Sequence, residues 1–159
     1  MLSLPQIQVY AFEFSCVLKK LVKEDWGLSL VYGPFPNGGC RMSSRLFGFF
    51  LNKKHYPVTH VSGISESGDR FPIPQEHAWL RFDSTSEEAR PGVIDLTCCQ
   101  FEDCDLPWPY VAFGVTWEET QWTNLETRAM SEETIGTEGC VVNELAILNR
   151  IMAEMSAEK

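Results

Sequence analysis

The sequence predicts a single α+β domain, in which two helices precede an antiparallel sheet and a third helix follows it. The hydrophobic pattern carries this prediction, because its period changes twice along the chain. Apolar residues recur every three or four positions near both ends, whereas they alternate with polar residues through the middle. The chain has 159 residues, the length of one ordinary domain, so one domain over 1–159 is expected.

Three segments have the pattern of amphipathic helices. The first, 5–23, begins at Pro5, which suits a first helical turn. A loop rich in glycine and proline over 27–39 separates it from a second helix over 40–52. The last helix has its apolar side chains at Val141, Leu145, Leu148, Met152 and Met155.

Four segments in the middle of the chain alternate as strands do. They are 57–64, 77–82, 92–97 and 110–117. The polar stretch 83–91 is typical of an exposed hairpin loop, and 118–139 is acidic and has no pattern that assigns it.

Charge and cysteine usage exclude several classes of partner. The net charge of −9 argues against a nucleic-acid backbone or an anionic membrane surface. The chain has no apolar run long enough to span a membrane, and its N-terminus lacks the basic start and cleavage site of a signal peptide. Adjacent Cys98 and Cys99 in a chain with a substantial core fit reduced thiols better than a disulfide framework. These features predict a cytoplasmic protein.

Two polar residues stand in the apolar strands, His77 at the start of one and Asp95 inside another. If the two strands pair with residue numbers summing to 172, His77 lies directly opposite Asp95, and sums of 170 or 174 place them diagonally on the same face. In each case the carboxylate can accept a proton from one imidazole nitrogen and leave the other nitrogen free as a base.

Cys40 stands at the start of the second helix, directly after Gly38 and Gly39. The positive end of a helix and a neighbouring imidazolium both lower a thiol pKa, and first-turn N–H groups can hold an oxyanion. The two glycines leave the approach to the sulfur open. Cys40, His77 and Asp95 therefore form a workable nucleophile, base and orienting group.

Three blocks in this order also resemble a known family. "GGCRMSSRLFGFFL", "HAWLRF" and "VIDLTCCQF" are similar to the Gly-x-Cys, His-Ala-Trp and Asp-x-Thr blocks of the transglutaminase-like branch of the papain-like cysteine-peptidase superfamily, and in particular to small bacterial members. The similarity covers residues 34–101. It implies a papain-like fold, with a cysteine-bearing helix packed on a sheet that carries the histidine and the aspartate.

The resemblance implies a cysteine-dependent enzyme that hydrolyses or transamidates an amide bond in a peptide or protein, with no cofactor and no metal. Cys40 would be the nucleophile, His77 the general base and acid, and Asp95 the orienting group. Trp79 would form a pocket wall and Gln100 a polar neighbour, with Gly39 at the substrate approach. Papain-like peptidases place an oxyanion-hole glutamine shortly before the cysteine, but none lies between Gln8 and Cys40. One donor would then be the Cys40 backbone N–H, and the second is unidentified.

Other interpretations of the same residues remain. Cys40 can be a small buried packing residue, and Asp95 can cap a turn or pair with Arg81. Cys98, Cys99 and Cys104 lack the spacing of a zinc knuckle, which disfavours a zinc protein. The remaining alternative is a non-catalytic interaction protein on the same scaffold. The tryptophans at 108, 117 and 122 fit packing better than a ligand cage.

Overall fold

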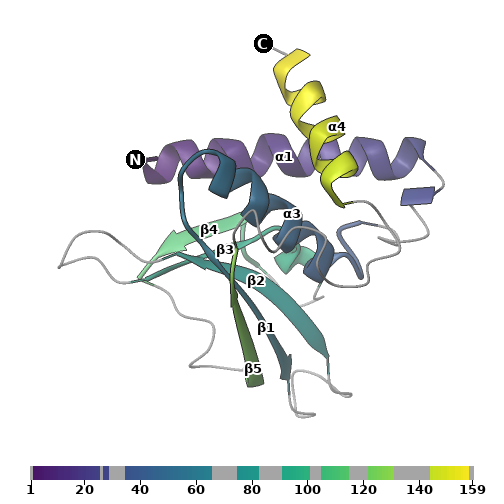
Figure 1. The fold of residues 1–159 in the computed structure, drawn as a ribbon. Helices are drawn as coiled ribbons and strands as arrows, with labels where there is room; N and C mark the ends of the chain where they lie inside the picture. The colour runs from purple at the N-terminus through teal and green to yellow at the C-terminus, as the bar shows by residue number, and fades with distance from the viewer. Residues whose placement is uncertain are drawn as a thin grey trace.

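In the part of the chain that the structure describes, α1 (Leu4–Glu24) and α3 (Cys40–Lys53) precede the strands and α4 (Glu144–Ala157) follows them (Figure 1). The computed structural model describes residues 2–25, 27–28, 35–65, 75–82, 91–100, 105–114, 122–130 and 144–157. The segment η1 (Cys98–Gln100) is a short 3-10 turn. The strands are β1 (Thr59–Ser65), β2 (Glu76–Phe82), β3 (Gly92–Asp95), β4 (Tyr110–Phe113) and β5 (Trp122–Ala129).

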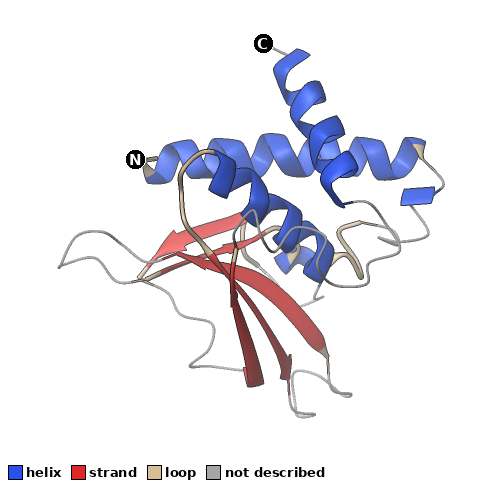
Figure 2. Ribbon diagram, in the orientation of Figure 1, coloured by secondary structure: helices blue, strands red, loops and turns tan. Residues whose placement is uncertain are grey.

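The five strands form one antiparallel sheet in the order β4-β3-β2-β1-β5. The helices gather on one side of this sheet, and α3 lies next to the strands (Figure 2). The α+β class and the helix-helix-sheet-helix order predicted from the sequence are confirmed.

The main core lies between the helices and the sheet. Phe14 of α1 contacts the rings of Phe47 and Phe50 of α3, with centroids 5.0 and 5.6 Å apart. Leu80 and Ile94 close this core from the strands. Successive strand residues face opposite sides of a sheet. The neighbours of Leu80 and Ile94 along the strands therefore belong to a second apolar cluster, on the other face. Its buried members are Val61, Trp79, Val93 and Trp122.

A glycine fits the pairing of β2 with β3. Gly92 lies opposite Phe82, and a Cβ atom on Gly92 would come within 2.1 Å of the Phe82 ring. The buried ring therefore covers a position where any larger residue would displace it. This close approach helps to hold the two strands in register.

The register of β2 with β3 differs from the one that would place His77 directly opposite Asp95. Leu80 pairs with Ile94 and Arg81 with Val93, so the residue numbers sum to 174 rather than 172. His77 is therefore not directly opposite Asp95. The two side chains lie diagonally on the same face, as the sequence predicts for this register.

Several element boundaries also differ from expectation. The expected strand 92–97 ends at Asp95, and Cys98 and Cys99 belong to η1 rather than to a strand. Strand β5 lies within the segment that the sequence left unassigned. In the expected apolar stripe of α4, Leu148 and Met155 are buried as predicted, whereas Leu145 is 42% exposed. Ile147 and Ile151, which were not in that stripe, complete the inner face of the helix. The predicted loop 83–90, Val141 and residues 115–117 of the last expected strand lie outside the described residues.

None of the helices in the described ranges combines the length and the apolar character that crossing a membrane would require.

Candidate active site

The N-terminus of α3 and the start of β2 border a cavity of about 500 Å³. Its walls come from the loop before α3, the first turn of α3, the first residues of β2 and the end of η1. The lining residues are Asn37, Gly38, Cys40, Arg41, Gln75, Glu76, His77, Ala78 and Gln100. Cys40 and His77 thus face one cavity although 37 positions separate them in the sequence.

The backbone before Cys40 is shaped by two glycines with different roles. Gly38 has a φ of +77°, a left-handed conformation that favours glycine, and a Cβ there would meet open space. Gly39 is the N-cap of α3, and its carbonyl accepts hydrogen bonds from the backbone N–H and the hydroxyl of Ser43 at 2.9 and 2.7 Å. Gly38, rather than Gly39, lines the cavity. Gly39, the glycine expected at a substrate approach, is not among the residues that line this cavity.

Cys40 is a free, partly exposed thiol in the first turn of α3. Burial would raise the pKa of this thiol, but the hydrogen bond to His77 and the charge of that ring outweigh it and lower the pKa below its ordinary value. The backbone N–H groups of Ala78 and Arg41 lower the pKa further, because they donate toward the sulfur. The site therefore favours a thiolate.

His77 is fully buried and bonded to Asp95. The His77 Nε2 atom lies 2.6 Å from Asp95 Oδ2, and both side chains are closed to solvent. Burial opposes a charge on the ring, but the Asp95 carboxylate, together with Cys40, raises the pKa of His77 to about 9. The thiol pKa is lowered and the imidazole pKa is raised because a thiolate and an imidazolium side by side stabilise each other.

Asp95 is fixed by the turn that ends β3. Its Oδ1 atom accepts a hydrogen bond from the Thr97 backbone N–H at 2.8 Å and contacts the Thr97 hydroxyl at 3.3 Å. This Asx-type turn explains why the strand stops at Asp95. The sequence already contained the signal, since an aspartate followed two residues later by threonine is a common turn pattern. Asp95 thus both forms a turn and bonds the histidine.

Gln100 links the helix entry to the imidazole. Its Oε1 accepts a hydrogen bond from the Gly38 N–H at 3.3 Å, and its Nε2 lies 2.7 Å from His77 Nδ1. Because Asp95 occupies Nε2, Nδ1 is the ring nitrogen left to face the thiol. With its Oε1 held by the Gly38 N–H, the Gln100 amide turns its NH2 toward Nδ1, where it can donate only to an unprotonated ring nitrogen. The expected polar neighbour therefore lies in direct contact with the base.

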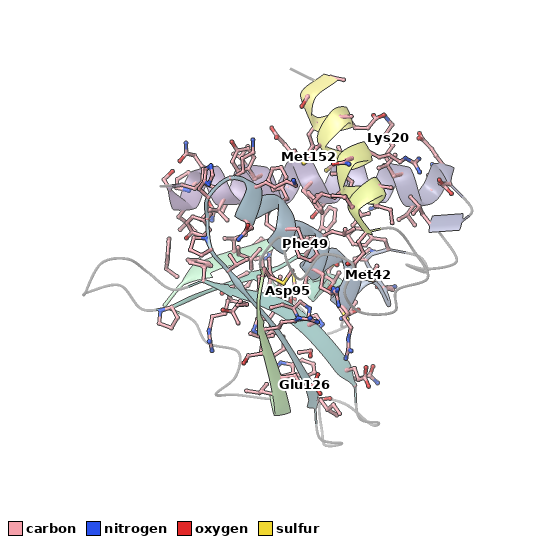
Figure 3. All side chains as sticks on the ribbon, in the orientation of Figure 1. Lys20, Met42, Phe49, Asp95, Glu126 and Met152 are labelled. Atoms are coloured by element: carbon pink, nitrogen blue, oxygen red, sulfur yellow. The ribbon has the colours of Figure 1, made fainter. Side chains whose placement is uncertain are left out.

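Two indole rings pack against the imidazole. The centroids of Trp79 and Trp122 lie 5.8 and 5.2 Å from that of His77. Trp79 is fully buried and does not line the cavity, so it supports the histidine from the second apolar cluster instead of forming a pocket wall. No sequence pattern indicates Trp122 at this site, because its place depends on the pairing of β5 with β1. Figure 3 shows Asp95 in the interior, where α3 meets the strands.

Cys98 and Cys99 are neighbours in η1 but differ in exposure. Cys98 is buried and contacts the Pro107 carbonyl at 3.6 Å, whereas Cys99 is exposed. Within the part of the chain that the structure describes, no three histidine, cysteine or acidic side chains gather into a group that could hold a metal. Cys104 and Cys140 lie outside the described residues.

None of the family models, curated proteins or solved structures compared with this chain matches it. The resemblance to the transglutaminase-like branch stays a prediction. Function is therefore inferred from the geometry of Cys40, His77 and Asp95.

Proposed function

We propose that this protein is a cysteine-dependent acyl-transfer enzyme that acts on amide bonds of peptides or proteins. The single observation that carries the proposal is the buried chain of hydrogen bonds from Asp95 through His77 to a thiol in the first turn of a helix. A buried imidazole with an ionic partner on one nitrogen and a thiol on the other is the arrangement that nucleophilic thiol catalysis needs.

The first half of the reaction forms a thioester. The Cys40 thiolate attacks the amide carbonyl carbon, and the backbone N–H of Cys40, in the first turn of α3, would donate to the oxyanion. His77 then gives its Nδ1 proton to the departing amine, the C–N bond breaks, and the acyl group stays on sulfur. The Asp95 carboxylate holds the Nε2–H throughout, which keeps the ring oriented.

The second half releases the acyl group. Water or an amine enters the cavity, and the neutral His77 Nδ1 removes its proton as it attacks the thioester. The C–S bond breaks and the Cys40 thiolate is regenerated. Water gives hydrolysis and an amine gives transamidation, and both use the same residues.

The test measures how the alkylation rate of Cys40 by iodoacetamide depends on pH. The exposed thiols Cys16 and Cys99 also react, so the adduct is followed by peptide mass mapping with Cys40→Ala as the blank. We expect an apparent pKa below the ~8.5 of an ordinary thiol. His77→Ala should raise it, whereas exchange of the exposed His55 for asparagine should leave it unchanged.

A Cys40 pKa that has the ordinary value and does not change in His77→Ala would contradict the proposal. It would favour a non-catalytic interaction protein. Electrophilic peptide probes complete the experiment, because an enzyme should form a covalent adduct at Cys40 that intact-mass measurement detects. Loss of this adduct in Cys40→Ala, but not in Cys99→Ala, is the expected result.

A further inference from the structure

A second pocket, of about 240 Å³, lies between α3 and the strands β1 and β5. Phe49 on α3 and Glu126 on β5 mark its helix side and its strand side in Figure 3. The lining residues are Arg41, Arg45, Phe49, His60, Ser62, Glu126, Thr127, Arg128 and Met130. Apart from Arg41, none of them lines the Cys40 cavity.

The basic residues of this pocket come from two elements that face each other, α3 and the strand pair β1–β5. Arg41, Arg45 and Phe49 are four residues apart on α3, so they share one face of the helix. On the sheet, His60 of β1 lies directly opposite Arg128 of β5. Such cross-strand partners share a face with Cβ atoms about 5 Å apart. Three guanidinium groups from two elements therefore surround one space.

The pocket is locally basic in an acidic protein. Its lining holds three arginines and one glutamate, whereas the whole chain has a net charge of −9. Arg45 is held in place by Glu144 of α4 at 3.1 Å, and this carboxylate is 2% exposed. Arg41 contacts Glu76 at 3.7 Å, but both side chains are mostly exposed, so this pair is weak. Guanidinium groups suit anions with several oxygens.

His60 adds an unusual feature to this basic pocket. It is only 7% exposed, and its Nε2 atom is buried with no hydrogen-bond partner among the described residues. The His60 ring also hydrogen-bonds the Arg41 backbone. Because Nε2 has no partner in the described part of the chain, this bond uses Nδ1, which donates its N–H to the Arg41 carbonyl. Burial, together with the charges of Arg45, Arg41 and Arg128, lowers the pKa of His60 to about 4. At neutral pH the ring is therefore uncharged, and Nε2 presents a lone pair.

A ligand that satisfies this pocket needs negative oxygens for the arginines and one O–H donor for His60 Nε2. A phosphate group with one proton left has both, because its second pKa is close to neutrality. A sulfate or a carboxylate has no proton to donate at neutral pH. A buried acceptor left without a donor weakens binding of those anions.

We propose that the pocket between α3 and the β1–β5 edge binds a protonated phosphate group, with Arg41, Arg45 and Arg128 on its oxygens and its P–O–H donating to His60 Nε2. The site shares Arg41 with the Cys40 cavity, but neither His77 nor Asp95 lines it, so the proposed acyl-transfer chemistry does not depend on it. Its ligand class is inorganic phosphate or a phosphomonoester.

The test compares inorganic phosphate with sulfate by isothermal titration calorimetry near neutral pH. We expect phosphate to bind at least about tenfold more tightly than sulfate, the contribution of one buried hydrogen bond to a charged ligand. His60→Phe should remove this discrimination, and Arg128→Gln should weaken both anions. Arg150→Gln on the surface of α4 is the matched control and should change neither.

Equal binding of the two anions, no heat at millimolar phosphate, or discrimination that survives His60→Phe would each overturn the proposal. If that variant does not fold, NMR of the unaltered chain decides. Phosphate should shift the His60 Nε2 resonance and sulfate should not, and the reverse result or no shift overturns the proposal.

Two further arms identify the source of the phosphate and separate the two sites. Tighter binding of O-phosphoserine than of inorganic phosphate would assign the pocket to a phosphomonoester, and the opposite order to free phosphate. Cys40→Ala should bind phosphate as the unaltered chain does. Phosphate binding can therefore fail or succeed independently of thiol reactivity.

Discussion

Asp95 uses both of its carboxylate oxygens inside the protein. Oδ2 bonds His77 and Oδ1 bonds the backbone N–H of Thr97. The bond to Thr97 holds Oδ1 in the turn, so Oδ2 is the oxygen that faces the His77 ring. A substitution that keeps the shape of Asp95 but replaces one acceptor oxygen with a donor NH2 group therefore tests the site at the level of one residue.

Asp95→Asn should slow Cys40 alkylation at neutral pH by about tenfold or more. The Thr97 N–H requires an oxygen, so the new amide NH2 would face His77 Nε2. The ring must then carry its proton on Nδ1, and it can no longer take the proton of the thiol. Turnover of an amide probe should fall about 10²- to 10⁴-fold. Mass spectrometry of the Cys40 peptide measures the alkylation rate.

The exposed Asp105 supplies the control for this substitution. Asp105→Asn makes the same chemical change away from the site and should leave alkylation unaltered. An Asp95→Asn protein that is folded and alkylates at the original rate would remove Asp95 from the thiol chemistry.

Single residues were predicted unevenly from the sequence. His77 and Asp95 stood out because polar side chains interrupt apolar strands, and the structure brings them together. Trp79 was placed wrongly, because a period of two cannot tell a buried face that supports the ring from a face that lines a cavity. Trp122 was missed at the site because its contact with His77 depends on long-range strand pairing.

At the scale of elements, one buried side chain ties the cysteine-bearing helix to the histidine-bearing strand. The Ser44 hydroxyl of α3 donates to the Ala78 carbonyl of β2 at 3.0 Å. Ser44 is one turn after Cys40, and Ala78 follows His77 directly. By joining α3 to the β2 backbone, this bond helps to set the distance between the Cys40 thiol and the His77 ring.

Ser44→Ala should lower the free energy of unfolding by about 1–3 kcal/mol, because the buried Ala78 carbonyl loses a donor. It should also slow Cys40 alkylation, since α3 can then shift relative to β2. Urea unfolding and alkylation at neutral pH measure the two effects.

Ser43→Ala is the matched control for this tether. Ser43 is equally buried, but its hydroxyl bonds Gly39 and Cys40 carbonyls within the same helix turn. It should change stability without separating the two elements. Equal effects of the two variants on alkylation would show that the bond between α3 and β2 is unimportant for the site.

Elements with a strong apolar period were predicted and β5 was not. Strand β5 faces partly into the basic pocket, so Glu126 and Arg128 occupy positions where an alternating strand would carry apolar residues. Strand β3 was predicted too long, because a side-chain bond to the backbone ended it and hydrophobicity does not report such bonds.

For the whole molecule, His60 should make stability depend on pH. Its pKa falls from the ordinary 6.5 to about 4 on folding, so the unfolded chain binds a proton more tightly. Stability should therefore fall as pH drops from 6.5 toward 4, by on the order of 3 kcal/mol, with no contribution from this group above that window. Urea unfolding at pH values above and below the window measures it.

His60→Gln should flatten this part of the stability profile. Replacing the exposed His55 by asparagine removes a histidine of the same chain from the surface, and the profile should persist. Asparagine suits that position because His55 has a φ of +58°. A His60→Gln protein that loses stability over the same window as the unaltered chain would assign the acid sensitivity to other groups.

The sequence by itself determined the α+β class, the helix-helix-sheet-helix order and the three polar residues of the candidate site, because hydrophobic period and its interruptions are local properties. The tertiary structure decided what depends on pairing between distant segments. That includes the register of β2 with β3, the packing of Trp79 and Trp122 on His77, and the basic pocket around His60. These features arise when strands and helices far apart in the chain meet, and no single stretch of sequence carries that information.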